Sequence, residues 1–172
     1  MVEMHLLFVC LGNICRSPAA EAVMAGKIKT AGWSDSIVCD SAGIIGYHSG
    51  ERSDSRMIKH ALRRGYNLTS LSRKVKPETD FEYFDMIIGM DDQNIKDLNS
   101  LARSDAHRKK IFRMTDFCTN SKYNHVPDPY YGDAEAFELV LNILEDACSG
   151  LIAHLEKQLT KTCSPKNRED VK

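Results

Sequence analysis

The sequence lacks several signatures that would indicate a metal, nucleotide or membrane protein. It has no CxxC pair and no two histidines at a spacing typical of metal ligands, so we expect no metal site. The nucleotide-binding pattern GxxxxGK followed by Ser or Thr is missing. The apolar run at residues 6–11 is too short for a signal peptide or a membrane span. With a formal net charge of −1, we expect a cytoplasmic protein that binds no cofactor, nucleic acid or membrane.

Length and composition indicate one folded domain. The chain has 172 residues, 42% of them hydrophobic, which is enough for one core. The helical pattern is lost after Leu159, so we expect the domain to cover residues 1–160 and residues 161–172 to form a flexible tail. The six cysteines would allow three disulfides, but in a chain of this size without a secretory signal we favour reduced thiols.

Short apolar runs alternate with helical patterns along the chain. Strands that alternate with helices form parallel sheets through right-handed crossovers. The predicted fold is therefore a single α/β domain, in which a four-stranded parallel sheet carries helices on both faces. Ligands of such folds bind at the carboxyl ends of the strands. We predict strands at residues 4–9, 36–40, 84–90 and 110–113, and helices at residues 19–29, 53–64, 91–101 and 137–155.

The loop sequence CLGNICRSP follows the first predicted strand. Ser17 and Pro18 suit the N-cap and the first position of a helix. Loop amides turned inward at Gly12, together with the positive end of that helix, would stabilise an anion. The same groups would stabilise two anions, the thiolate of Cys10 and a bound phosphate. We therefore predict a phosphate-binding loop after the first strand.

Three other side chains strengthen this interpretation. Arg16 brings a planar fork that matches two phosphate oxygens. Ser17 can donate its hydroxyl to the thiolate, and Asn13 can brace the loop through its amide. A cysteine at a strand end is by itself most often a buried hydrophobic residue, and Gly-Asn is most often a turn. Their combination with Arg16 and the Ser-Pro cap favours a nucleophile in an anion cradle.

The segment Cys10–Pro18 resembles the active-site signature of the low-molecular-weight protein tyrosine phosphatases, C-x5-R followed by Ser or Thr. A second motif, Asp128-Pro-Tyr-Tyr131, resembles the acid loop of the same family, and the resemblance extends over about residues 4–158. It implies hydrolysis of phosphotyrosine in protein substrates through a phosphocysteine on Cys10, without a metal. Inorganic phosphate and similar oxyanions are the implied competitive ligands.

The resemblance also assigns roles within the site. Cys10, Arg16 and Asp128 are the implied catalytic residues, with Asp128 as general acid and base. The second loop cysteine, Cys15, is implied to form a reversible disulfide with Cys10. The substrate-binding residues are expected to be Leu11, Gly12, Asn13, Ile14, Cys15, Ser17, Tyr47, Tyr130 and Tyr131.

Simpler interpretations remain open for several of these residues. Asp128 lies between two prolines and can be an ordinary Asp-Pro turn. Tyr130 and Tyr131 can form a wall for the substrate ring or pack in the core. Cys15 can be a small side chain that fits within the loop and takes no part in redox chemistry. Tyr47 has the weaker support, because the residues around it diverge from the family pattern.

Three rival functions are considered. Arsenate reductases of this type need a further cysteine pair on a mobile segment, and the remaining cysteines lie far apart. Arginine phosphatases carry threonine where Ile14 stands, whereas an apolar residue suits a phenyl ring. A non-catalytic phosphotyrosine-binding module would have no use for Asp128. The sequence also has Ser70 and Ser72 in a segment where some relatives have a histidine.

Overall fold

The computed structural model describes residues 3–120 and 122–162, which fold around a four-stranded parallel sheet. The strands lie in the order β2-β1-β3-β4, and all neighbouring pairs are parallel. This confirms the predicted fold class. The strand bounds are β1 Met4–Cys10, β2 Ile37–Gly43, β3 Met86–Gly89 and β4 Ile111–Arg113.

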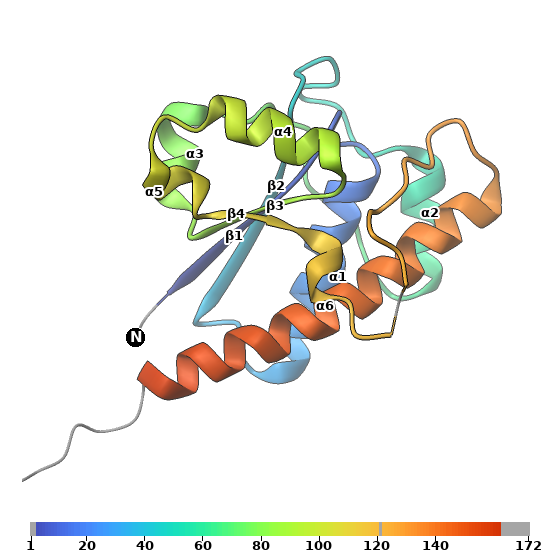
Figure 1. The fold of residues 1–172 in the computed structure, drawn as a ribbon. Helices are drawn as coiled ribbons and strands as arrows, with labels where there is room; N and C mark the ends of the chain where they lie inside the picture. The colour runs from blue at the N-terminus through green and yellow to red at the C-terminus, as the bar shows by residue number, and fades with distance from the viewer. Residues whose placement is uncertain (1–2, 121, 163–172) are drawn as a thin grey trace, which may run out of the picture.

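The central strand β1 is buried on both faces, and its side chains alternate between two cores. Leu6 and Phe8 pack with helices α1 (Arg16–Ala31) and α6 (Ala134–Thr162). Leu7 and Val9 pack with residues of α3 (Pro77–Tyr83) and α4 (Asp92–Leu101) on the opposite face. Figure 1 shows these two helical layers on either side of the sheet. The continuous apolar run in the sequence is therefore explained by burial on both sides.

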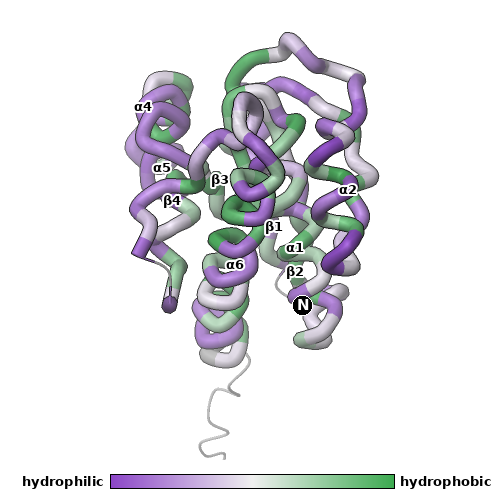
Figure 2. The backbone as a smooth tube through the Cα atoms, turned by 90° about the vertical axis from the view of Figure 1, so that its right-hand side faces the viewer, coloured by the Kyte–Doolittle hydropathy of each residue, from purple (hydrophilic) through white to green (hydrophobic). Residues whose placement is uncertain are grey.

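The remaining elements complete the two layers. Helix α2 (Ser55–Arg63) packs against α6, and the 3-10 helix η1 (Met114–Phe117) also contacts α6. The short helix α5 (Asp105–Arg108) precedes β4. In Figure 2 the central elements are largely hydrophobic, whereas α4 at the outside is mostly hydrophilic. Within the described ranges, no helix has both the length and the apolar character needed to cross a bilayer.

The start of α1 differs from the prediction. The helix begins at Arg16 after Cys15, two positions before Pro18, the residue predicted to stand first in it, so Ser17 is not the N-cap. The Ser17 hydroxyl instead contacts Cys10 and Asn13. Pro18 is accommodated at the third helical position because backbone N–H groups of the first turn have no intrahelical partner.

The bounds of other helices and strands also differ from the predicted ones. Strand β2 extends to Gly43 because it pairs with the full length of β1, with Cys10 opposite Gly43. Helix α2 is shorter than predicted at its start, since Asp54 caps it. The prediction missed α3, α5 and η1. Helix α6 continues through Thr162, two residues into the range predicted as a tail, and the rest of that range lies outside the described residues.

Candidate active site

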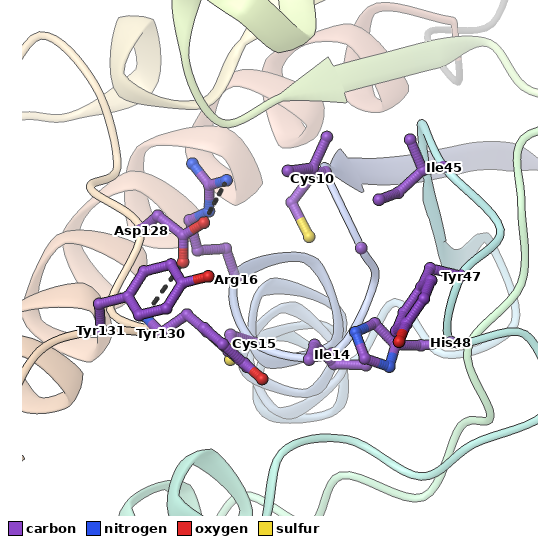
Figure 3. Close-up of a pocket in the computed structure, with 12 residues that line it drawn as sticks. Cys10, Ile14, Cys15, Arg16, Ile45, Tyr47, His48, Asp128, Tyr130 and Tyr131 are labelled. Carbon is purple, nitrogen blue, oxygen red and sulfur yellow. Dashed lines mark hydrogen bonds and ion pairs between the residues drawn. The ribbon is translucent and has the colours of Figure 1, made fainter.

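The candidate nucleophile, Cys10, ends β1 at the carboxyl edge of the sheet. Its Sγ lies 3.0 Å from the hydroxyl oxygen of Ser17, which is fully buried. Figure 3 shows the sulfur pointing into the centre of the pocket. The backbone of the loop passes close to β2, where a Cβ on Gly43 would meet the carbonyl oxygen of Leu11 at 2.9 Å. Only glycine lets strand and loop approach this closely.

Asn13 stabilises the conformation of the phosphate-binding loop from the side away from the cavity. Its backbone is left-handed, with φ of 56°, a conformation that asparagine tolerates better than most residues. Its Nδ2 donates to the hydroxyls of Ser17 (2.9 Å) and Ser41 (3.0 Å), and its Oδ1 accepts from the backbone N–H of Arg73 (2.9 Å). The bond from Arg73 sets the orientation of the amide. Because Ser17 accepts from Asn13, its own proton is left for one of two acceptors, the Cys10 sulfur at 3.0 Å or the carbonyl of Ala42 at 3.3 Å.

A half-buried carboxylate lies at the far end of this hydrogen-bond chain. Glu21 on α1 accepts from the hydroxyls of Ser41 (2.5 Å) and Ser70 (3.0 Å). Burial raises the pKa of Glu21, although both hydroxyls act to lower it. Ser70 is thus part of the network. The chain Glu21–Ser41–Asn13–Ser17–Cys10 connects α1 with the nucleophile.

Arg16 is buried at the start of α1 and is held by two acceptors. Its Nη1 donates to Oδ2 of Asp91 (2.6 Å) and to the carbonyl of Val126 (3.1 Å). Its Nη2 lies 3.5 Å from Oδ2 of Asp128. Burial acts to lower the pKa of Arg16, but Cys10 and the two aspartates more than compensate and raise it. The guanidinium is therefore a fixed positive charge.

Asp128 reaches the site from a loop that is distant in sequence. The loop is anchored by a hydrogen bond from the backbone N–H of Val126 to the carbonyl of Met90 (2.8 Å). One Asp128 oxygen accepts from the backbone N–H of Tyr130 (3.1 Å), so the Asp-Pro turn is real. Its other oxygen faces Arg16. The turn and the position beside Arg16 thus coexist in one side chain.

These residues surround a cavity of about 370 Å³. Figure 3 shows Tyr130 and Tyr131 on one side of the Cys10 thiol and Tyr47 on the other. Tyr131 is 97% exposed, which rules out core packing for this residue. The lining consists of Cys10, Leu11, Gly12, Ile14, Cys15, Arg16, Ile45, Tyr47, His48, Asp128, Tyr130 and Tyr131.

Ten of the twelve predicted site residues line this cavity; Asn13 and Ser17 lie behind the loop. Sequence reasoning missed Ile45 and His48 in the lining and Asp91 as the partner of Arg16. His48 is held by Glu51, with 2.7 Å between Nδ1 and Oε2. The only sequence signal for these residues was their position after strands β2 and β3, whose ends face the site.

Cys15 lies in the same loop and is almost fully buried. Burial and the nearby carboxylate of Asp54 raise the pKa of its thiol well above the ordinary range. Cys15 is therefore a neutral thiol at physiological pH, unsuited to act as the nucleophile.

Comparison with known proteins places this geometry in a family. The family model of the low molecular weight phosphotyrosine protein phosphatases matches residues 5–161. The chain belongs to this family. It is accordingly a protein tyrosine phosphatase, a hydrolase that acts on phosphotyrosine. The family resemblance and the enzyme class expected from the sequence are thus confirmed.

Individual relatives cover nearly the whole chain. A Synechocystis sp. protein, whose name assigns it to the low molecular weight protein-tyrosine-phosphatases, is 44% identical over 156 residues, 91% of this chain and 99% of its own length. A protein tyrosine phosphatase from Entamoeba histolytica, crystallised with Hepes in its active site, is 50% identical with a TM-score of 0.88. The alignment covers 91% of this chain and 99% of that one. The Drosophila arginine phosphatase has the same fold, with 26% identity, a TM-score of 0.82 and coverage of 89% and 98%.

Proposed function

We propose that this tyrosine phosphatase works in two steps through a phosphocysteine on Cys10. The observation that carries the proposal is the convergence of the Cys10 thiol, the Arg16 guanidinium and the Asp128 carboxyl on one cavity. In the first step the Cys10 thiolate attacks phosphorus and the bond from phosphorus to the tyrosyl oxygen breaks. Asp128 gives its proton to that oxygen, because a phenol leaves more readily than a phenolate.

The second step regenerates the enzyme. A water molecule attacks the phosphocysteine, the Asp128 carboxylate takes a proton from the water, and the sulfur–phosphorus bond breaks. Inorganic phosphate and the Cys10 thiolate are the products. The hydroxyl of Ser17, 3.0 Å from the sulfur, donates to the thiolate as it leaves.

Arg16 is well placed to bind the phosphoryl oxygens. Both protons of Nη1 are used by Asp91 and Val126. The other edge of the guanidinium, Nε with Nη2, makes no hydrogen bond to the described residues. Its one ion pair there is the 3.5 Å approach of Nη2 to Asp128, and the edge can take two phosphate oxygens side by side. Together with the loop amides it would stabilise the charge that develops in phosphoryl transfer.

The shape of the cavity favours an aryl phosphate. Cys10 lies at the floor, while Tyr47 and Tyr130 stand at opposite walls (Figure 3), so a phosphotyrosine ring can lie between them as its phosphate reaches the loop. Phosphoserine is too short to use both walls. Phosphoarginine is the second candidate, given the likeness to the Drosophila arginine phosphatase. The apolar Ile14 in the lining favours the phenyl ring.

The test compares hydrolysis of phosphotyrosine, phosphoserine and phosphoarginine peptides, with Cys10→Ser as the inactive control. We expect phosphotyrosine to be preferred and rapid quenching to leave the labelled phosphoryl group on Cys10. Label on another residue would overturn the nucleophile assignment. A preference for phosphoarginine would replace the substrate class, and Ile14→Thr would then be expected to increase it.

When Cys10 is oxidised, Cys15 in the same loop can act as the resolving cysteine. Once an oxidant converts Cys10 to a sulfenic acid, Cys15 must first lose its proton; its thiolate then attacks the Cys10 sulfur, the disulfide forms, and the departing hydroxide takes up a proton to leave as water. We expect a thiol reductant to restore activity to the wild type but only partly to Cys15→Ser. A location in the cytoplasm, expected from composition, stays a prediction.

A further inference from the structure

The segment that carries Tyr130, residues 129–133, is joined to the rest of the protein by few hydrogen bonds, although Pro129 is buried. The backbone N–H of Tyr130 donates to Asp128 (3.1 Å), and Gly132 donates to the carbonyl of Pro129 (2.9 Å). In the described ranges, every hydrogen bond of residues 129–133 stays within residues 128–136. Backbone bonding therefore shapes this segment but does not attach it to the body of the enzyme. Side-chain contacts must therefore attach residues 129–133 to the rest of the protein.

Arg56 on α2 supplies such a contact. Its guanidinium carbon lies 5.4 Å from the centre of the Tyr130 ring and 4.8 Å from the centre of the Phe137 ring. Both distances are within the range of a cation–π interaction. Phe137 is buried and stacks on His60 with 5.7 Å between ring centres. Arg56 thus contacts one ring that is fixed in the core and one that belongs to the pocket wall.

Asp54 determines where Arg56 points. Its two oxygens accept from Nε (3.0 Å) and Nη2 (2.8 Å) of Arg56, so the guanidinium is gripped along one edge. The backbone N–H of Asp54 donates to the carbonyl of Ile14 in the phosphate-binding loop (2.8 Å). The side-chain hydrogen bond from Arg56 is the main reason why the pKa of Asp54 is lowered. A continuous path therefore connects the phosphate-binding loop with Tyr130 through Ile14, Asp54 and Arg56.

We propose that Arg56 is a positioning residue that holds the Tyr130 wall at a set distance from the phosphate-binding loop and thereby favours aromatic phosphoesters. The inference rests on the proposed function. Arg56 does not line the cavity, so it acts through Tyr130 and not on the phosphate itself. Loss of Arg56 should weaken binding of the substrate ring while leaving the phosphate cradle intact.

The test compares Arg56→Gln with Arg56→Lys. Glutamine removes the charge over the Tyr130 ring, whereas lysine keeps it. We expect Arg56→Gln to raise KM for a phosphotyrosine peptide by about 2- to 5-fold, the equivalent of one exposed cation–π contact. The inhibition constant for inorganic phosphate should stay within a factor of about 1.5 of wild type. Arg56→Lys should recover most of the KM, and Lys59→Gln, an exposed change on the same helix, serves as the matched control.

Three results would overturn the inference. An equal rise in KM and in the phosphate inhibition constant would mean that Arg56 acts on the loop, and an unchanged KM would mean that the contact has no role. The third concerns the Tyr130→Ala background, in which Arg56→Gln should have no further effect on KM. A full additional effect would exclude Tyr130 as the intermediary.

Absence of phosphotyrosine turnover in the wild type would refute the proposed function instead. In that case the same variants can be compared through phosphotyrosine-peptide binding to Cys10→Ser.

Discussion

Replacing Asn13 by alanine removes three hydrogen bonds and leaves a backbone conformation that alanine disfavours. The lost partners are the hydroxyls of Ser17 and Ser41 and the backbone N–H of Arg73. Asn13 itself is buried, so water cannot easily take its place. The change should therefore destabilise the whole domain as well as distort the loop that carries Cys10.

The magnitude follows from these contacts. Three hydrogen bonds at ~1 kcal/mol each account for about 3 kcal/mol, and the left-handed backbone adds about 1–2 kcal/mol for alanine. The expected loss in the free energy of unfolding is thus about 4–5 kcal/mol, a large share of the 5–15 kcal/mol typical of a domain. Asn13→Gly loses the same bonds but tolerates the φ of 56°. It should be more stable than Asn13→Ala by about 1 kcal/mol, after the larger unfolded-state entropy of glycine is subtracted.

Urea unfolding of the wild type and both variants measures these differences, and inhibition by inorganic phosphate reports on the loop. Both variants should bind phosphate more weakly than the wild type. Equal stability of the glycine and alanine variants would contradict the strain argument. A loss below about 1 kcal/mol in both would contradict the bracing role, since it would be no more than one net hydrogen bond.

Three other predictions concern the groups around the nucleophile. Asp128→Ala should slow single-turnover phosphorylation by about 10²–10⁴-fold for phosphotyrosine and less for aryl phosphates with acidic phenols; a plot of rate against phenol pKa no steeper than that of wild type would exclude Asp128 as the acid. Iodoacetamide at neutral pH should label Cys10 before Cys15, with protection by phosphate, because the Cys15 thiol stays protonated; peptide mapping decides the order. The pKa of Glu21 is raised by burial, so its stabilising contribution is complete below about pH 4.3, the unfolded pKa, and is lost as pH rises through the folded pKa. Urea unfolding at several pH values should show this fall in the wild type and not in Glu21→Gln, and equal slopes would contradict it.

Local sequence was sufficient for the phosphate-binding loop and for the elements that carry it. One apolar run in the sequence predicts that the side chains of Leu6 to Val9 are buried on both faces of the sheet. Cys10 and Arg16 are close enough in sequence for their spacing to determine their relative positions. The same holds for the periodic part of α6. The bounds of β2 were less accessible, because its pairing with β1 extends the strand to Gly43.

The positions of long-range partners were decided by the tertiary structure. Arg16 lies beside Asp91 and Asp128 because β3 and the acid loop end at the same edge of the sheet as β1. Asn13 could be assigned a bracing role from sequence, but its partners Ser41 and Arg73 follow only from the register of neighbouring segments. A side-chain hydrogen bond depends on distances of a few tenths of an ångström, and those are fixed only when strands pair and helices pack.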